Sequence, residues 1–413
     1  MKYSSDIIVA GAGAAGMAAA ITAARCGATV MILEHMDMAG KKILATGNGK
    51  CNYTNSRQGV ECYYGDDPAF VLPVFAQFGF RETIAFFEEL GVLPKERRGY
   101  YYPASGQASS IHEVLLMELK RLNVKIIYNC GIRSIQKEQK GFRFDTKTGG
   151  YYSKLCLLAT GGCASKKTGS DGSGFLYLKH FSHHIIDTVP ALVGLIGRQS
   201  FFKELAGVRA EVRINLYIEN EWKISEEGEL QLTDYGISGI PVFQVSRFAS
   251  KALVKGESVH ALLNFLPHVE AEELEKYLGK CFLQREKTAK QALIGTFQSK
   301  LIPVFLRLSG IDEKQMADKV GQIRLKRLAD VIRNFRVDII GTKKFDHAQV
   351  TAGGVDTSEI VNETLESKLV QGLFFAGEMI DIDGKCGGYN LQWAWSSGYV
   401  AGLHAAKRGK EIV

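Results

Sequence analysis

Apolar residues near the N-terminus fall into short runs that flank an alanine-rich segment. Residues 6–10 (DIIVA) predict a short buried strand, residues 11–27 a glycine-opened helix, and residues 28–34 (ATVMILE) a second strand. Two strands joined by a helix of this length form a parallel βαβ unit. The N-terminal pattern therefore predicts an α/β fold.

Further along, helical and strand-like spacing alternates up to about residue 190. Helical spacing occurs at residues 81–91 and 111–122, and strand-like runs occur at 124–128, 134–136, 141–146 and 155–159. The order then changes to strands followed by helices, with an alternating segment at 208–218 and charged helical segments at 270–287 and 312–330. From about residue 351 the α/β character returns, with a buried strand at 374–376 and a final helix at about 390–407. This order predicts a middle region inserted into an α/β domain.

The composition is that of an ordinary folded protein. Of the 413 residues, 46% are hydrophobic and 23% are charged, and the length predicts two or three domains. The net charge of +7 comes from scattered Lys and Arg without a long basic block. We therefore expect no nucleic-acid partner and only a mild preference for anionic ligands. No segment is long enough to span a bilayer, so we expect no membrane association.

Eight cysteines are spread along the chain, and none belongs to a C-x-x-C pair. Neither a zinc ribbon nor a thioredoxin-type site is indicated, and we expect no bound metal. Scattered cysteines in a chain of this length are typical of a reducing, cytoplasmic setting. The cysteines are Cys26, Cys51, Cys62, Cys130, Cys156, Cys163, Cys281 and Cys386.

A glycine motif lies between the first predicted strand and helix. Gly11, Gly13 and Gly16 form a G-x-G-x-x-G pattern in the strand–helix context that dinucleotide binding requires. The first glycine permits a tight turn, the second lets the backbone approach a pyrophosphate, and the third lets the helix pack on the strand. Glu34 ends the second strand, where an acidic side chain binds ribose hydroxyls and would repel the 2′-phosphate of NADP.

Two later segments favour FAD over NAD as the bound dinucleotide. Residues 159–162 (ATGG) end a buried strand with small residues that permit a second close approach to a ligand. Residues 372–378 (GLFFAGE), followed by Asp381 and Asp383, form a strand and turn near the end of the sequence. FAD enzymes of the two-dinucleotide-binding class use such a segment for the ribityl chain and pyrophosphate.

The final helix is preceded by a second pair of glycines, Gly387 and Gly388. Asn390 is the expected N-cap, and Trp393 and Trp395 are expected to bury the helix. A helix N-terminus beside the flavin N1–C2=O edge would stabilise the negative charge of reduced flavin.

These motifs together resemble the aminoacetone oxidase-like, BaiN-like NAD(P)/FAD-dependent oxidoreductases of bacteria, over nearly the whole chain. The family usually has Arg where this chain has Lys50, and Gly-Pro where it has Gly239-Ile240. The matching segments are Gly11–Gly16 with Glu34, 40–55 (GKKILATGNGKCNYTN), 159–162, 168–174 (TGSDGSG), 190–193 (PALV), 233–239 (TDYGISG), 351–355 (TAGGV) and 376–392.

The resemblance implies an α/β, Rossmann-like FAD-binding domain of the two-dinucleotide-binding type, interrupted by an inserted β-barrel-like domain with a small helical subdomain. The expected limits are residues 1–190 and 345–413 for the FAD-binding domain. For the β-rich substrate or cap domain they are 191–265 and 325–344, and for the helical subdomain 266–324.

Loop 40–55 offers Gly, Thr and Asn donors that suit a flavin ring with a substrate over it, but no catalytic residue is assigned. The candidates near the flavin are Asn48, Lys50, Cys51, Asn52 and Cys386. The residues predicted to bind the cofactor are Gly11, Gly13, Ala14, Ala15, Gly16, Glu34, Lys42, Thr46, Gly47, Asn52, Ala159, Thr160, Gly161, Gly377, Glu378, Asp383, Gly388, Tyr389, Asn390, Leu391 and Gln392.

For the other reactive or aromatic side chains, a structural role is favoured over a catalytic one. A redox role for Cys51 and Cys386 is considered, but small packing residues are favoured. His183 and His184 lack metal-ligand spacing and are interpreted as structural. Residues 100–102 (YYY) would suit an aromatic wall of a substrate pocket, although such clusters more often belong to a core.

The leading hypothesis for function is an FAD enzyme that moves a hydride between flavin N5 and a small organic molecule. Its preferred form is NAD(P)H-driven reduction of a conjugated C=C bond, of the oxidised bile acid or steroid enone type. No second G-x-G-x-x-G motif with βαβ context occurs, so NADH or NADPH would bind only transiently. The alternatives are an oxygen-dependent oxidase of a small amine and a non-catalytic FAD- or RNA-binding module.

Overall fold

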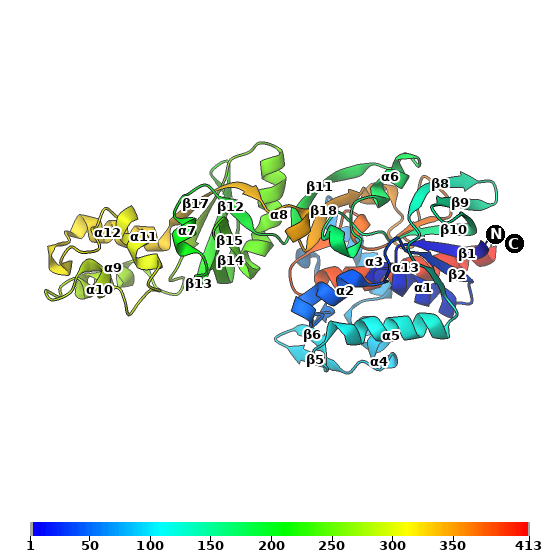
Figure 1. Cartoon of the computed structure of the whole chain (residues 1–413), viewed down its shortest axis with the longest axis horizontal. Coiled ribbons are helices and arrows are strands. Elements are labelled where there is room, and N and C mark those ends of the chain that lie inside the picture. The colour runs from blue at the N-terminus through cyan, green and yellow to red at the C-terminus, as the bar shows by residue number, and fades with distance from the viewer. Residues whose placement is uncertain (1–2, 412–413) are drawn as a thin grey trace. The chain divides into compact units, whose positions relative to one another are not determined.

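The computed structural model describes residues 3–411, which divide into two compact units (Figure 1). Unit 1 contains the chain up to Val189 and again from Gln349, and unit 2 contains Pro190–Ala348. Each unit has its own hydrophobic core. The expected outer domain limits at residues 1 and 413 lie outside the described residues.

Unit 1 is built on a seven-stranded mixed sheet. Its parallel strands lie in the order β7-β2-β1-β10-β19, and β9 and β8 continue antiparallel from the N-terminal half of β10. These strands are β1 (Tyr3–Ala10), β2 (Val30–Leu33), β7 (Lys125–Ile127), β8 (Ile132–Glu138), β9 (Gly141–Thr146), β10 (Gly150–Leu158) and β19 (Leu373–Phe375). The predicted Rossmann-like fold is confirmed, and its sheet combines strands from both ends of the chain.

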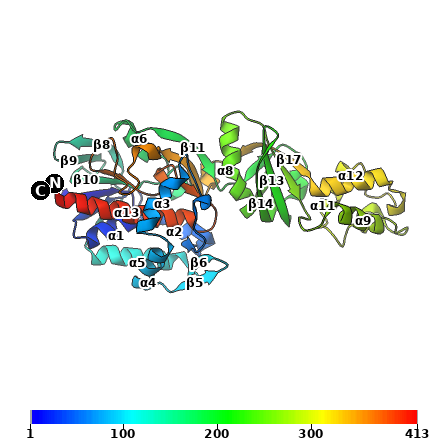
Figure 2. The same cartoon turned by 180° about the vertical axis from the view of Figure 1, so that it is seen from behind.

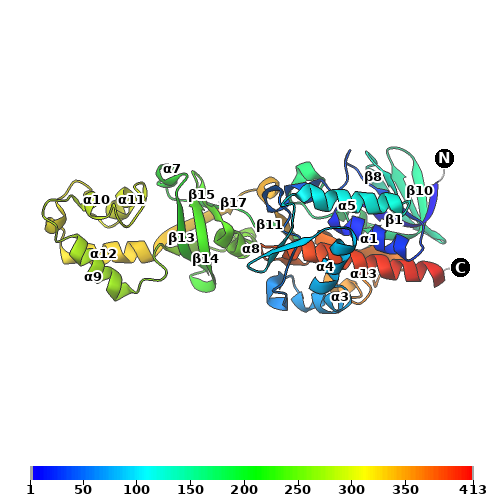
Figure 3. The ribbon, with the colours of Figure 1, turned by 90° about the horizontal axis from the view of Figure 1, so that it is seen from below.

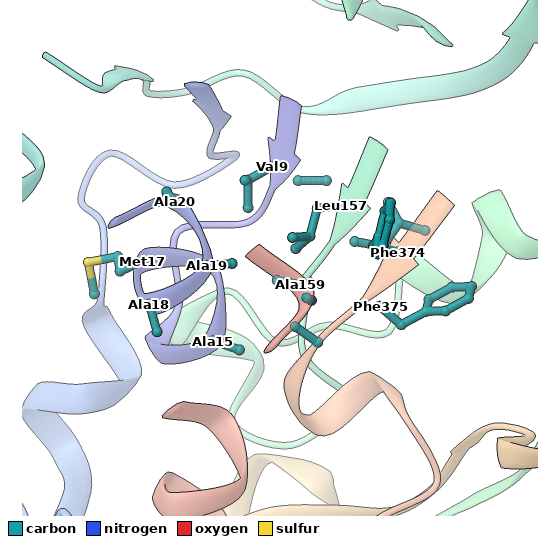
Figure 4. Packing of buried hydrophobic residues seen from close by; sticks show 14 of the residues in the cluster. Val9, Ala15, Met17, Ala18, Ala19, Ala20, Leu157, Ala159, Phe374 and Phe375 are labelled. Carbon is teal, nitrogen blue, oxygen red and sulfur yellow. The ribbon is translucent and has the colours of Figure 1, made fainter. Parts of the chain in front are cut away.

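One face of this sheet is covered by two helices that are far apart in the sequence. Helix α1 (Ala14–Arg25) and helix α13 (Tyr389–Glu411) lie side by side (Figures 2 and 3). Alanines of α1 lie near Val9 and Leu157 of neighbouring strands, and Met17 lies on the other side of the helix (Figure 4). Small side chains therefore bring α1 close to the sheet and leave room for α13.

The remaining elements of unit 1 surround this layer. A small sheet joins β3 (Thr54–Asn55), β6 (Tyr100–Pro103) and β5 (Pro94–Arg97), and the two-residue strands β4 (Tyr63–Tyr64) and β20 (Asp383–Gly384) pair with each other. Strand β11 (Ile185–Ala191) pairs with β18 (Val350–Val355). The helices are α2 (Lys41–Ala45), α3 (Val71–Gln77), α4 (Phe80–Glu89), α5 (Ala108–Arg121) and α6 (Gly174–Lys179).

No single helix in residues 3–411 is long and apolar enough to cross a membrane. One pair of segments, Pro68–Gln77 and Phe80–Glu89, meets the length and composition criteria only when taken together across a 46° bend.

Unit 2 contains a closed antiparallel barrel of six strands in the order β12-β15-β14-β13-β16-β17. The strands are β12 (Leu195–Gly197), β13 (Arg209–Ile218), β14 (Glu221–Leu232), β15 (Gly236–Gly239), β16 (Val259–Asn264) and β17 (Phe335–Thr342). The helices are α7 (Phe202–Leu205), α8 (Ile240–Val254), α9 (Ala271–Cys281), α10 (Ala289–Ala292), α11 (Leu301–Leu308) and α12 (Gln322–Arg333). The predicted β-barrel-like insertion with a helical part is therefore confirmed.

Two helix predictions in this unit need correction. The segment 270–287 is helical only to Cys281, and the segment 312–330 is helical only from Gln322. The parts of the two segments outside these helices use other bonds: Ala317 N–H donates to the carbonyl of Lys287, and the Asp312 side chain accepts from the N–H of Lys314. A short polar side chain that binds nearby backbone groups ends helical pairing, and charge-rich spacing alone does not reveal this.

Replacing residues 190–348 by a short Gly/Ser linker should leave a folded unit 1 that binds FAD but does not turn over substrate. All residues predicted to bind FAD lie in unit 1, which has its own core. The cut ends lie on paired strands, where Gly353 faces the carbonyl of Asp187, so a short linker can join them. FAD content after gel filtration and flavin reduction by substrate would be measured. A folded protein that loses FAD, or one that turns over at the full rate, would contradict this prediction.

Candidate functional site

The glycine motif forms the tight turn that its spacing predicts. Gly11 has φ +98°, a left-handed conformation, and a Cβ there would lie 2.6 Å from the carbonyl oxygen of Ala159. A Cβ on Gly16 would overlap the carbonyl oxygen of Gly11. Any side chain at either position would push apart β1, α1 and the end of β10. The motif therefore holds the ends of two neighbouring strands against the start of α1.

Gly13 differs from its two partners because open space surrounds it. It is the N-cap of α1 and has an extended backbone, and no side chain caps the helix by a hydrogen bond. A Cβ added to Gly13 would meet nothing within 4 Å. Ala14 and Ala15 follow as the first helical residues, and their short side chains leave the helix N-terminus uncovered. Uncapped N–H groups at a helix N-terminus are a binding site for anions. This end of α1 therefore fits the pyrophosphate of a dinucleotide.

Glu34 lies beside this turn at the end of β2 and is buried. One carboxylate oxygen accepts the N–H of Ala12 at 2.8 Å, and the other accepts the N–H of Met36 at 2.7 Å. Each carboxylate oxygen can accept a second hydrogen bond. The side chain is therefore fixed in place and retains acceptor capacity for ribose hydroxyls.

The end of β10 and the loop after β19 meet on the other side of the turn. Ala159, Thr160 and Gly161 follow β10, and the buried Oγ1 of Thr160 has no hydrogen-bond partner within residues 3–411. A Cβ on Gly377 would lie 2.7 Å from the Cβ of Ala15. The two predicted dinucleotide segments from opposite ends of the chain are therefore in direct contact.

An ion pair connects this loop to α2. Lys42 Nζ lies 2.6 Å from Oε2 of Glu378, whose Oε1 accepts the N–H of Thr351 at 2.9 Å. Both Lys42 and Glu378 are predicted cofactor ligands, and the structure places them together. Their pairing balances the two charges and joins α2, β18 and the 377–379 turn.

Loop 46–52 has an unusual backbone for residues other than glycine. Gly47, Asn48 and Cys51 have φ values of 55°, 53° and 53°. Asn and Gly tolerate the left-handed region, whereas a left-handed Cys is uncommon. Thr46 Oγ1 donates to the carbonyl of Ile43 at 2.6 Å, which anchors the start of the loop. The loop therefore has a fixed and strained shape, which is common where a backbone is held against a ligand.

The candidate residues in this loop differ in their exposure to solvent. Asn48 and Lys50 are exposed, Cys51 is fully buried, and the buried Oδ1 of Asn52 has no hydrogen-bond partner within the described chain. A buried, unsatisfied amide oxygen is costly unless a ligand or water supplies a donor. Asn52 therefore fits contact with a bound group better than its three neighbours do.

The segment before α13 returns to this loop. A Cβ on Gly388 would lie 3.0 Å from Oδ1 of Asn52, so the loop and the start of α13 touch. Asp383 is buried on β20, Tyr389 is buried, and Leu391 is half-buried.

One prediction for this segment is corrected. Asn390 is not the N-cap, because α13 begins at Tyr389 and Asn390 lies in its first turn, where its side chain binds both the N–H and the carbonyl of Gly384 at 2.8 Å. Gln392 is fully buried: its amide donates to Thr83 and Ser396 and accepts from Thr54. The amide of Gln392 is therefore used inside the protein, where it fixes α13, and contact of this residue with FAD stays a prediction.

Strand β6 brings tyrosines to the same place. Tyr101 points into the core, where its ring meets Phe80 with centroids 5.0 Å apart. Tyr100 and Tyr102 point the other way: a Cβ on Gly387 would lie 2.5 Å from Cε1 of Tyr100, and one on Gly47 would lie 3.9 Å from Cε1 of Tyr102. Residues 100–102 therefore do not form one aromatic cluster, because side chains alternate between the two faces of a strand. Tyr101 belongs to the core, and Tyr100 and Tyr102 lie on the face toward the loops.

The sequence feature that could have predicted β6 is the hairpin turn before it. Arg98 and Gly99 both have positive φ, 56° and 90°, as the central residues of a two-residue hairpin loop do. The Arg-Gly pair between polar and aromatic alternating residues is a local signal for β5 and β6, two strands that hydrophobic spacing alone does not predict.

The two cysteines near the site are thiols and not thiolates at neutral pH. Burial raises the pKa of the Cys51 thiol to about 12 and that of the Cys386 thiol to about 11. The thiolate is the reactive form of cysteine in redox chemistry and metal binding. These pKa directions favour the packing role for both residues.

His183 and His184 are held by carboxylates, and the ring of His183 packs against Phe375. His183 lies between Glu359, at 2.8 Å, and Ser367, at 2.9 Å. Burial lowers the pKa of His183, and Ser367 Oγ also accepts the N–H of Val370 at 2.8 Å. A buried serine used in this way secures a turn, which agrees with the structural interpretation of these histidines.

Known proteins are similar to this chain over nearly its whole length. The model of the HI0933-like protein Rossmann domain matches residues 5–404. A 3-dehydro-bile acid delta(4,6)-reductase of Clostridium scindens is 43% identical over 406 residues, covering 97% of this chain and 98% of that protein. A ribosomal RNA dihydrouridine synthase of Haemophilus influenzae is 30% identical over 415 residues, covering 98% of this chain and all of that protein.

Among solved structures, the open conformation of a flavocytochrome c3 fumarate reductase is similar in fold. It superposes with a TM-score of 0.52 at 18% identity, covering 98% of this chain and 79% of that one.

Gly13→Ala should leave the fold intact and weaken FAD binding by roughly tenfold or more, because the added methyl enters the space meant for the pyrophosphate. No protein atom obstructs that methyl, so unfolding of the apo-protein should change by about 1 kcal/mol or less. Gly279→Ala in α9 is the matched control, since nothing lies near its Cβ position either. FAD titration and thermal unfolding would be measured. Unchanged FAD affinity in Gly13→Ala would show that the pyrophosphate does not lie at the start of α1.

Proposed function

The chain belongs to the HI0933-like Rossmann family, and from this premise we propose that it adds a hydride to a C=C bond conjugated to a carbonyl. It is an FAD-dependent oxidoreductase, as the family, the close reductase relative and the Rossmann-type FAD-binding fold indicate together. FAD, when bound and reduced, supplies the hydride at N5. The residues described above would hold that cofactor at its pyrophosphate, its ribose and its ring system.

The observation that carries the proposal is the reaction shared by relatives with different substrates. One relative is named for reducing a bile acid at delta(4,6), and the others for making dihydrouridine in ribosomal RNA. A 3-oxo steroid with a 4,6-diene and a uracil ring both contain a C=C bond conjugated to a carbonyl. In each product that bond has gained a hydride and a proton. We infer that this chain performs the same reduction.

The chain's own residues have three tasks in this reaction. The uncapped start of α1 would bind the pyrophosphate, and Glu34 would bind the adenosine ribose. The left-handed loop at Gly47 and Asn48 and the buried Oδ1 of Asn52 would hold the ring system. The start of α13, with its partial positive charge, would favour the anionic form of a reduced flavin ring bound beside it. These groups bind and orient the cofactor, and a solvent-exchangeable proton completes the reduction.

The substrate class follows the more similar relative. Identity of 43% over almost the full length of both proteins supports a small enone of the oxidised bile acid or steroid type. The proposed electron donor is NADH or NADPH bound transiently, because the described fold contains one dinucleotide site formed by Gly11–Gly16 and Glu34. The proposed partner is thus a small molecule and not a nucleic acid, and the proposed setting is a bacterial cytoplasm.

A second candidate substrate is a uridine in ribosomal RNA. The specific observation in its favour is that two relatives with that name are 30% identical over nearly the whole chain. The chemistry at the flavin would be the same, and only the approach of the substrate would differ. The amine-oxidase alternative has no comparable support among these relatives, and neither has a non-catalytic module.

Anaerobic mixing of the reduced enzyme with a 3-oxo-4-ene steroid should reoxidise the flavin, because the conjugated bond accepts the hydride. The saturated 3-oxo steroid is the matched control and should leave the flavin reduced. The reduction step would be measured separately with NADH, NADPH and aminoacetone. Flavin reduction by aminoacetone, followed by reoxidation with oxygen only, would assign the chain to amine oxidation instead.

A further inference from the structure

The small sheet β3-β6-β5 has one face turned toward the two loops that fit the flavin ring. In an antiparallel pair, residues directly opposite each other point to the same side. Lys95 lies opposite Tyr102, and Arg97 lies opposite Tyr100. Asn55 also lies opposite Tyr100, from the other neighbouring strand. We name these five residues the tyrosine–cation face.

Contacts show which way this face points. Asn55 Nδ2 donates to the carbonyl of Gly387 at 3.0 Å, and the ring of Tyr100 packs against the same glycine. Tyr102 lies against Gly47 and is close enough to Cys386 for the two to interact electrostatically. The opposite face has Tyr101 packed on Phe80 in the core. The tyrosine–cation face therefore borders both loops, and the other face is structural.

Apart from Asn55, whose amide is bound to Gly387 and Arg57, the polar side chains of this face are not used within the described chain. Lys95 and Arg97 are exposed and form no ion pair within residues 3–411. In the same described part of the chain, the hydroxyls of the half-buried Tyr100 and Tyr102 have no hydrogen-bond partner. Burial raises the pKa of Tyr102, so its hydroxyl remains protonated and can donate to a carbonyl. Two aromatic rings, two donors and two cations are thus available to a ligand.

We propose that the tyrosine–cation face binds the substrate, and that this substrate is a flat conjugated carbonyl compound with an anionic group. Tyr100 and Tyr102 contact the ring system and its carbonyl, and Lys95 and Arg97 attract the anionic group. Aromatic faces bind flat rings, and Lys and Arg bind carboxylates or phosphates. The assignment rests on the proposed enone reduction, because it places the conjugated bond beside the loops that hold the flavin. The assigned occupant is a small carboxylate-bearing enone.

The test compares an anionic and a neutral form of one probe on the full-length, FAD-loaded protein. The probes are 3-oxo-chol-4-en-24-oic acid and its methyl ester, and their dissociation constants are measured from the change in flavin absorbance and by calorimetry. The wild type should bind the acid more tightly than the ester, by roughly tenfold at low salt, because two exposed cations contribute. Higher ionic strength should reduce this preference.

Lys95→Ala with Arg97→Ala should remove the preference for the acid and leave the affinity for the ester unchanged. Lys95→Glu with Arg97→Glu should reverse it. Lys140→Ala with Lys147→Ala is the matched control, because both lysines are exposed near hairpin turns of the same unit. Both substituted cations are on the surface, so these variants should fold. Equal binding of acid and ester by the wild type, or an unchanged preference in the alanine variant, would overturn the proposal.

Two further outcomes separate this proposal from the proposed reaction. An acid that binds through Lys95 and Arg97 but fails to reoxidise the reduced flavin would support the binding face and contradict the enone reduction. A uridine hexanucleotide that binds through these two residues more tightly than the acid would overturn the small-molecule assignment and identify RNA as the source of the anionic group.

Discussion

The close packing of α1 against α13 is the constraint on which the rest of unit 1 depends. A Cβ on Gly398 or Gly402 would overlap the backbone of α1 at Ala15 or Ala19. The two helix backbones are therefore in contact, and a side chain in place of either glycine of α13 would force them apart. Because α1 begins near the N-terminus and α13 ends the described chain, this contact closes the Rossmann-type unit around an insertion of about 160 residues.

The candidate site follows from that closure. When α13 lies on α1, the loop before it reaches the turn at Gly11–Gly16, and Gly377 meets Ala15. The same arrangement sets Gly388 against Asn52 and Gly387 against Tyr100. Four segments that are far apart in the sequence then meet at the predicted dinucleotide site. Hydride transfer takes place at a single flavin atom, so the cofactor must be held firmly by contacts from several directions.

The sequence predicted those parts of the structure that depend on local pattern. The first βαβ unit could be predicted from the sequence, and with it the fold class. Its strand, the glycine spacing at Gly11–Gly16 and the acidic Glu34 follow one another at the intervals that the backbone of a dinucleotide-binding unit requires. Long-range contacts were not. The inward position of Gln392 depends on Thr54 and Thr83, and the pairing of Lys42 with Glu378 joins residues far apart in the sequence. The hairpin at Arg98-Gly99 has a local signal, but its two faces become distinct only when β6 pairs with β3.

The most direct test of the proposed reduction is the product of one anaerobic turnover. Full-length protein with photoreduced FAD would be mixed without oxygen with an equimolar 3-oxo-4-ene steroid carboxylate, and the steroid would be analysed by mass spectrometry alongside the flavin spectrum. We predict that each steroid molecule reduced gains two hydrogens at the conjugated bond for each flavin reoxidised. Unchanged steroid beside flavin that stays reduced until oxygen is admitted would contradict the proposed reduction.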